Sequence, residues 1–345
     1  MGEWAIPTLA VLLLGYGGTA LSFVWLSRVH SMGSLIAAVV AYGLFISFVD
    51  LGANSVGSDY EHLHGVRAMN GLHAGFSLGG LLGALGSAFV LWSGADFRAV
   101  YLGLALVLAV AAAAATVAPL PVRARAAAAH RNPPPQQPVW RIPAVCFAIA
   151  LIAVTFFGDG ALESFLAVYF RGTLGSSVLL TGAGLAAYHL ASLTGRLLAT
   201  RVLRRWKERA TVLGAGVFAA GGIALAVLAP SAGLAISGLL LVGLAIAPVV
   251  PSALSLAGRA APGRAAQAVA VSTASGYGVY VFSPLAVGEL AQATNLRVGL
   301  ALLIATSLVI AVLGSRWPAA TDEPSRPTGQ GAGTTAPTDA VAGRS

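Results

Sequence analysis

Ten apolar runs, each long enough to cross a lipid bilayer as a helix, dominate the 345-residue sequence. A membrane-spanning helix needs about 20 predominantly apolar residues, whereas a spanning strand needs only about 10. The runs lie near residues 6–27, 33–57, 72–93, 99–120, 142–168, 178–200, 210–229, 232–256, 265–288 and 298–316. Their lengths fit helices, which satisfy every backbone polar group internally. The sequence therefore predicts an all-α integral membrane protein with about ten transmembrane helices.

The composition agrees with a protein that faces lipid. Hydrophobic residues make up 57% of the chain and charged residues 9%, whereas an ordinary soluble domain carries about 25% charged residues. The formal net charge is +8, but the positive residues lie between the apolar runs and do not predict nucleic-acid binding. A single cysteine, Cys146, permits neither an intramolecular disulfide nor a thiolate metal cluster.

The distribution of basic residues predicts the orientation. If both termini are cytoplasmic, all but four of the 20 Lys and Arg residues lie on the cytoplasmic side, as the positive-inside rule requires. The tryptophans fall at the ends of runs, where indole rings prefer the headgroup level. Because Arg greatly outnumbers Lys and Ala and Gly abound, a GC-rich bacterial source is indicated. We expect a multi-pass protein of the bacterial inner membrane with both termini in the cytoplasm.

One segment between runs is longer than the others and divides the chain. Residues 121–141 are basic and rich in proline (PVRARAAAAHRNPPPQQPVWR), which is typical of an interdomain linker. We therefore predict an N-terminal bundle of four spans at 1–120 and a C-terminal bundle of six spans at 142–317. Residues 318–345 have almost no large apolar side chains and are expected to form a disordered cytoplasmic tail.

Asp50, in the second run, is a costly residue inside a membrane and therefore informative. Asn54 lies four residues further on and shares its helical face. One interpretation is a protonatable carboxylate in a central cavity that binds substrate or a proton. The other is a buried carboxylate that bonds a neighbouring helix.

Asp159 and Glu163, in the fifth run, are also four residues apart and share a face. Paired carboxylates suit a proton relay. Because this run is expected to lead outward, a solvated vestibule or gate near the outer side explains the pair equally well.

His189 falls near the middle of the sixth run, beside Tyr188. It could bind substrate or a proton, or make a hydrogen bond between helices. Tyr277 belongs to a polar stretch in the ninth run and is a further candidate for the substrate site. The other histidines show no convincing metal-ligand spacing and no nucleophile–base pair is evident. The sequence thus predicts no metal, no cofactor and no enzymatic activity.

Glycines and prolines predict how the helices pack. Gly75, Gly79 and Gly83 recur every four residues in the third run, a stripe that lets another helix approach closely. Pro248, in the eighth run, and Pro284, in the ninth, are expected to kink their helices.

Several segments resemble the major facilitator superfamily, and specifically its fucose-permease-like bacterial branch. They are, in order, VDLGANSV, NGLHAGFSLGGLLGA, GDGALESF, TGRLLATRVLRRW and LVGLAIAPVVPSALSLAGR. The resemblance implies two helical bundles joined by a cytoplasmic loop, with a small organic solute, sugar-like or another metabolite, bound between them. It further implies proton-coupled transport by alternating access, with symport as the expected mode, in contact with the lipid bilayer.

The resemblance also implies roles for individual residues. It places Asp50 where the family has a carboxylate that handles protons or substrate. It implies that residues 195–207 form a conformational loop, in which the basic and small residues that match the family are Gly195, Arg196, Arg201, Arg204 and Arg205. The aspartate usual in that loop is replaced, since Ala199 and Thr200 occupy the candidate positions.

The resemblance begins at the family's third helix, so that four and six spans take the place of the usual twelve. We expect the native gene to encode two further helices before Met1, or this product to be inactive. An efflux pump of the same superfamily and a non-transporting remnant or scaffold are the alternatives. The sequence does not indicate an oligomeric state.

Overall fold

The computed structural model describes residues 5–64, 69–117, 137–261 and 264–318, and within these ranges it is built from helices alone. The predicted tail and most of the predicted linker lie outside the described residues. The α-helices are α1 (Ala5–Leu26), α2 (Met32–His64), α3 (Met69–Trp92), α4 (Phe97–Val117), α5 (Pro143–Val168), α6 (Val178–Arg205), α7 (Glu208–Leu228), α8 (Ala232–Ile246), α9 (Val249–Ala260), α10 (Ala265–Ala293) and α11 (Leu296–Ser315). A 3₁₀ turn (Val139–Arg141) precedes α5 and a π turn (Tyr169–Thr173) follows it.

The prediction of an all-α membrane protein is confirmed. Among the described residues, 9 helical segments are long and apolar enough to cross a membrane, and α8 and α9 together form one of them. The one predicted span that is not among these segments, near residues 265–288, is α10, which is long enough at 29 residues but less apolar because serines and tyrosines interrupt it.

The two predicted proline kinks differ in outcome. Pro248 lies between α8 and α9 and precedes the first residue of α9, so the eighth span is broken there, as expected of a residue without a backbone N–H. Pro284 instead lies inside α10 without ending it.

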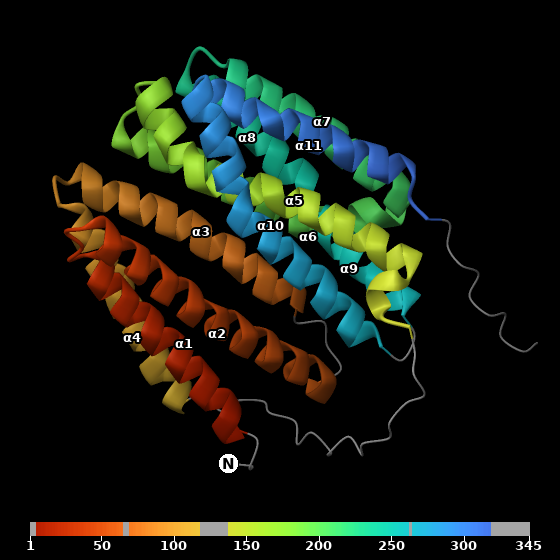
Figure 1. Ribbon diagram of the computed structural model, residues 1–345, viewed down its shortest axis with the longest axis horizontal. Coiled ribbons are helices and arrows are strands. Elements are labelled where there is room, and N and C mark those ends of the chain that lie inside the picture. The colour runs from red at the N-terminus through yellow and green to blue at the C-terminus, as the bar shows by residue number, and fades with distance from the viewer. Residues whose placement is uncertain (1–4, 65–68, 118–136, 262–263, 319–345) are drawn as a thin grey trace, which may run out of the picture.

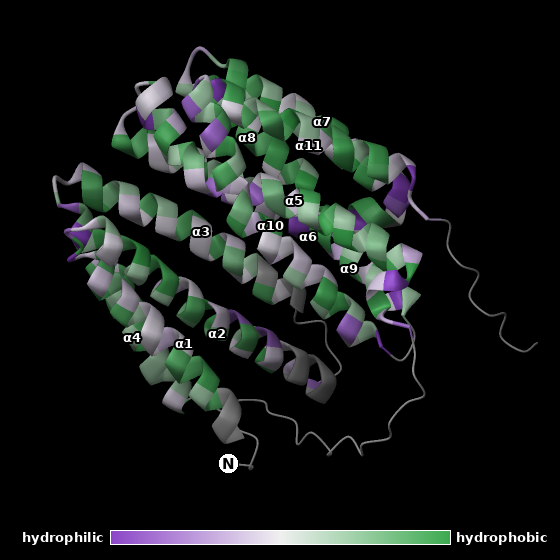
Figure 2. Ribbon diagram, viewed as in Figure 1, coloured by the Kyte–Doolittle hydropathy of each residue, from purple (hydrophilic) through white to green (hydrophobic). Residues whose placement is uncertain are grey.

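The helices form two groups with α3 between them (Figure 1). The helices α1, α2 and α4 lie together, and α5 to α11 form the larger group, whose core consists of small and aliphatic residues with a few aromatic ones. The helix α3 packs mainly against α6, so it joins the two groups. Hydrophobic residues cover most of the length of the helices (Figure 2), as expected where lipid replaces water.

Glycine permits the closest approach in the C-terminal group, between α7 and α11. A methyl group at Gly216 would lie 2.6 Å from the Ser307 carbonyl oxygen, and one at Gly314 would lie 2.7 Å from the Leu213 Cα atom. Such backbone-to-backbone contact is how helices associate tightly in a bilayer.

The predicted role of the glycine stripe on α3 is wrong for the described residues. A methyl group at Gly75, Gly79 or Gly83 would meet nothing within 4 Å. The helix instead makes its close contact through Gly80, where a methyl group would lie 2.7 Å from the Nδ1 and Cε1 atoms of His189. The glycines do recur every four residues, but the face of α3 that packs closely against α6 is the one that carries Gly80.

Candidate functional site

Three carboxylates inside the spans share one arrangement, in which each accepts a hydrogen bond from a tyrosine on another helix. The pairs are Asp50 with Tyr277 (3.2 Å), Asp159 with Tyr188 (2.5 Å) and Glu163 with Tyr280 (2.6 Å). Intramembrane carboxylates are rare and mark functional pathways more often than not. These pairs, drawn from α2, α5, α6 and α10, define the candidate site.

Asp50 joins the two groups of helices. Its carboxylate lies on α2 and is exposed, and it accepts the Tyr277 hydroxyl from α10 at Oδ2. Asn54, one turn further along α2, donates from Nδ2 to Oδ1 of Asp50 at 3.0 Å, so these residues do share a face. Tyr277 was predicted as a site residue, and the structure brings it to Asp50 although they are 227 residues apart.

Asp159 and Glu163 lie half-buried on one side of α5. Asp159 reaches toward α6 and Glu163 toward α10. Gly160 explains the closeness of α10, because a methyl group there would lie 2.5 Å from the Tyr280 carbonyl oxygen. The small residue between the two acids therefore helps to bring the Tyr280 hydroxyl to Glu163.

A small cavity adjoins Asp159 on the side of α7, α8 and α11. Its volume is about 20 Å³, and its polar lining consists of Asp159, Thr155, Thr306 and Ser307. A polar space of this size holds about one water molecule. Asp159 thus lies between the Tyr188 hydroxyl and a space that water can occupy.

His189 is buried, with 7% of its surface exposed. Its ring packs against Gly80 of α3 and meets the Tyr188 ring edge-on at 5.6 Å between centroids. The described residues include no hydrogen-bond partner for the His189 ring. The contact that His189 makes with α3 is one of packing.

Arg196 lies next to the acids and not in a loop. Its guanidinium donates a hydrogen bond to the buried Ser77 hydroxyl on α3, and it is close enough to Asp159 and Glu163 to interact with them electrostatically. Ser77 was missed from the sequence, because a lone serine on an apolar helix gives no signal of its own.

The predicted conformational loop at 195–207 is corrected by the structure. The helix α6 continues to Arg205 and leaves only Trp206 and Lys207 before α7. The apolar run was taken to end at 200 because arginines follow, yet arginine is a good helix former.

The predicted loop residues occupy different places on α6. Gly195 is buried against the α8–α9 break, where a methyl group would lie 2.6 Å from the Ala247 Cβ atom. Arg201 and Arg205 are exposed at the end of the helix, and the side chain of Arg204 lies outside the described residues.

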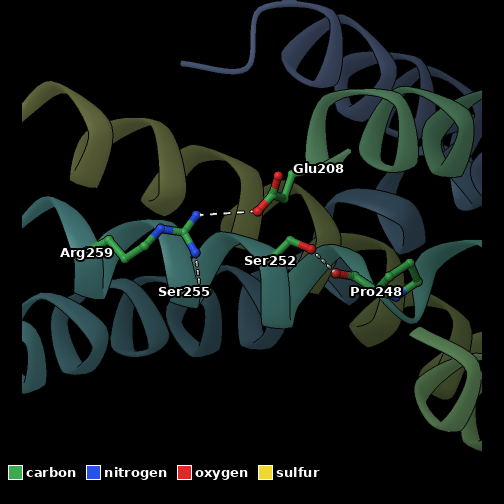
Figure 3. Close-up of polar contacts among 5 residues, drawn as sticks. All are labelled: Glu208, Pro248, Ser252, Ser255 and Arg259. Atoms are coloured by element: carbon green, nitrogen blue, oxygen red, sulfur yellow. Dashed lines mark hydrogen bonds and ion pairs between the residues drawn. The ribbon is translucent and has the colours of Figure 1, made fainter. Parts of the chain in front are cut away.

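An ion pair joins the first residue of α7 to α9 (Figure 3). Glu208 Oε1 lies 3.7 Å from Arg259 Nη2, and Arg259 also donates to the Ser255 hydroxyl at 2.7 Å. Both side chains are about half exposed, and an exposed pair contributes about 0–1 kcal/mol. This ion pair therefore adds little stability, and it connects two helices of the C-terminal group without contacting the N-terminal helices.

Tyr42 is a residue that sequence reasoning missed. It lies on α2 and is close enough to Glu163 and Tyr280 for electrostatic interaction. The sequence offered little signal for it, since Tyr42 lies eight residues before Asp50 and is therefore turned from it by about 80° around the axis of α2.

Comparisons with known proteins agree on one family. A family model described as Major Facilitator Superfamily matches residues 6–284. An uncharacterized MFS-type transporter of Yersinia pestis is 28% identical over 302 residues, which cover 86% of this chain and 77% of that protein. An uncharacterized transporter of Sinorhizobium fredii is 25% identical over 285 residues, which cover 81% and 73%.

Solved structures share the fold. A bacterial homologue of the human lysosomal transporter Spinster, inward-facing and unoccupied, has a TM-score of 0.66 at 16% identity, with 91% of this chain and 86% of that chain covered. The major facilitator transporter FucP, in the outward conformation, has a TM-score of 0.61 at 13% identity, with 92% and 83% covered.

Proposed function

The chain belongs to the Major Facilitator Superfamily, a family of secondary transporters and not of enzymes, and from that premise we propose that it moves a small organic solute across the membrane by alternating access, coupled to protons. The observation that carries this proposal is the set of three carboxylate–tyrosine pairs inside the spans. One of them, Asp50 with Tyr277, bridges the N-terminal and C-terminal groups of helices.

Alternating access needs contacts between the groups that break and reform easily. Asp50–Tyr277 is a single hydrogen bond at 3.2 Å between side chains that are both exposed. Such a bond contributes about 0.5–1.5 kcal/mol, or up to about 3 kcal/mol where a charged group takes part. Solute binding can supply that amount, so the contact suits a gate that opens in each cycle.

Proton coupling needs groups that change charge inside the membrane. Asp159 and Glu163 are suited to this role because each retains a neutral hydroxyl partner whether or not it is ionised. The cavity beside Asp159 offers room for the water that a proton relay uses. Arg196, close to both acids, responds electrostatically to their loss or gain of a proton.

The orientation and the domain division are part of the proposal. We place the end carrying Arg201 and Arg205 in the cytoplasm of a bacterial cell, with both termini on that side and the division into two bundles near residues 121–141. Cysteines introduced at Ala127 and Ser231 into a Cys146→Ser background report on this. Labelling of intact cells by a membrane-impermeant maleimide is expected at Ser231 and not at Ala127, and the reverse pattern contradicts the orientation.

The experiment for the function uses the purified 345-residue chain in liposomes that contain the pH-sensitive dye pyranine. A panel of sugars, organic amines and carboxylic acids is added one at a time, and proton movement is followed by fluorescence. At least one solute is expected to move protons, and Asp159→Asn with Glu163→Gln is expected to abolish that movement while the protein still inserts. If no solute in the panel moves protons or crosses the membrane, the proposal is wrong for this chain.

A further inference from the structure

We propose that the transported solute carries a positive charge and that Asp50, together with Tyr277, binds its cationic group between the two groups of helices. This inference rests on the proposed function and names the substrate class of the same site.

The balance of charge around the site is the first argument. Among the described residues, the three carboxylate–tyrosine pairs contribute the acids Asp50, Asp159 and Glu163, and Arg196 contributes one guanidinium. Arg196 interacts electrostatically with Asp159 and Glu163 and donates to Ser77, so its charge is already engaged. When these carboxylates are ionised, they outnumber the one guanidinium among the described residues, and their negative charge attracts cations and repels anions.

Asp50 is a carboxylate whose polar contacts, among the described residues, are with neutral groups. Its polar contacts are the Asn54 amide at 3.0 Å and the Tyr277 hydroxyl at 3.2 Å, and both donors are neutral. Within the described residues no lysine, arginine or histidine nitrogen lies within 4.0 Å of its oxygens. Charged groups inside membranes usually pair with an opposite charge, and a bound cation supplies the one that the described residues do not.

Aromatic rings stand beside this carboxylate. Tyr277 is 46% exposed, and its ring meets Phe156 of α5 in an edge-on contact at 5.3 Å between centroids. Gly276 allows this packing, because a methyl group there would lie 2.8 Å from the Phe156 ring. An ammonium group close to an ionised carboxylate and the face of an aromatic ring gains from both, which is the usual setting for recognition of organic amines.

A neutral sugar accounts less well for these features. Hydroxyl groups can bond to Asp50 and Asn54, but they leave the carboxylate without an opposite charge. A protonated Asp50 would remove that difficulty, in which case the residue carries the coupled proton and has no preference for cations. The two accounts differ in what Asp50→Asn does to solute binding and exchange, as opposed to proton-driven accumulation.

The test measures binding to the purified chain in lipid nanodiscs by titration calorimetry. The probes are choline, tetraethylammonium and spermidine as cations, 3,3-dimethylbutan-1-ol as the neutral isostere of choline, glucose as a neutral polyol and lactate as an anion. At least one cation is expected to bind, and the neutral and anionic probes are not. Asp50→Asn is expected to raise the dissociation constant of the cation by about tenfold or more, because losing a contact with a charged group typically weakens affinity by at least that factor.

Two control variants test whether the negative charge at Asp50, and not a carboxylate elsewhere, is responsible for cation binding. Asp50→Glu retains the charge and is expected to keep measurable cation binding. Glu289→Gln removes an exposed carboxylate from a groove near the end of α10, away from Asp50, and is expected to bind cations as the wild type does.

The outcomes separate this inference from the proposed function. Equal binding of choline and its isostere, unchanged cation affinity in Asp50→Asn, or failure of every cation to bind overturns the cationic substrate. If liposomes show proton-linked transport of a neutral solute, or if Asp50→Asn retains solute exchange and loses only accumulation, the transporter stands and the substrate class is wrong. If no solute is transported at all, the proposed function itself fails.

Discussion

At the residue scale, the acids and their tyrosine partners differ in how far the sequence could reveal them. Asp50, Asp159 and Glu163 stand out because charge is costly in lipid, and four-residue spacing correctly placed Asn54 beside Asp50. The partners could not be paired in advance, since Tyr277 and Asp50 are separated by 227 positions and periodicity fixes only the face of each helix. Ser77 and Gly80 gave no signal, because one serine and one glycine among many carry no pattern.

Gly80 offers a prediction at this scale. In Gly80→Ala the new methyl group would meet the His189 ring at 2.7 Å, whereas in Gly79→Ala it would meet nothing within 4 Å. Overpacking of a tight contact costs about 1–3 kcal/mol, so Gly80→Ala is expected to be less stable than Gly79→Ala by about that amount. Unfolding of both variants in the same detergent measures the difference, and the matched change in helix propensity cancels. Equal stabilities would show that α3 and His189 are not in contact.

At the element scale, the apolar runs predicted most of the helices, and the exceptions have physical reasons. The end of α6 was placed too early, because arginines near the end of a span lower hydropathy without ending the helix. The break between α8 and α9 follows from Pro248 and was expected as a kink. Which faces pack could not be deduced from the sequence, since in lipid both faces of a helix are apolar and the glycine stripe on α3 is only one of several small-residue faces.

The contact between α2 and α10 yields a prediction about motion. In a Cys146→Ser background, cysteines at Asn54 and Gly278 place one thiol on each helix next to the Asp50–Tyr277 contact without replacing either residue. A bifunctional methanethiosulfonate linker is expected to stop solute exchange in proteoliposomes, and a reducing agent is expected to restore it. Each single-cysteine protein, treated in the same way, controls for the effect of modification. Exchange that continues at the uncrosslinked rate, with linkage verified by mass spectrometry, contradicts the gating role of this contact.

At the scale of the whole molecule, the family and the fold were predictable from the order of weak motifs along the chain. The family model and the shared fold confirm that prediction. The structure adds the way α3 joins the two groups of helices through α6, and the pairing of the three acids with tyrosines of α6 and α10. No single segment of the sequence contains that site, because its members come from both halves of the chain.

We propose that a proton gradient drives a solute across the membrane through this site. Its most direct measurement is accumulation of the identified solute in proteoliposomes with an imposed pH gradient, compared with liposomes without one. Wild-type protein is expected to concentrate the solute above equilibrium, and a protonophore is expected to collapse the accumulation. Asp50→Asn is expected to insert normally but not to accumulate the solute. Accumulation that does not depend on the pH gradient, or that is unchanged in Asp50→Asn, would show that this site does not couple protons to the solute.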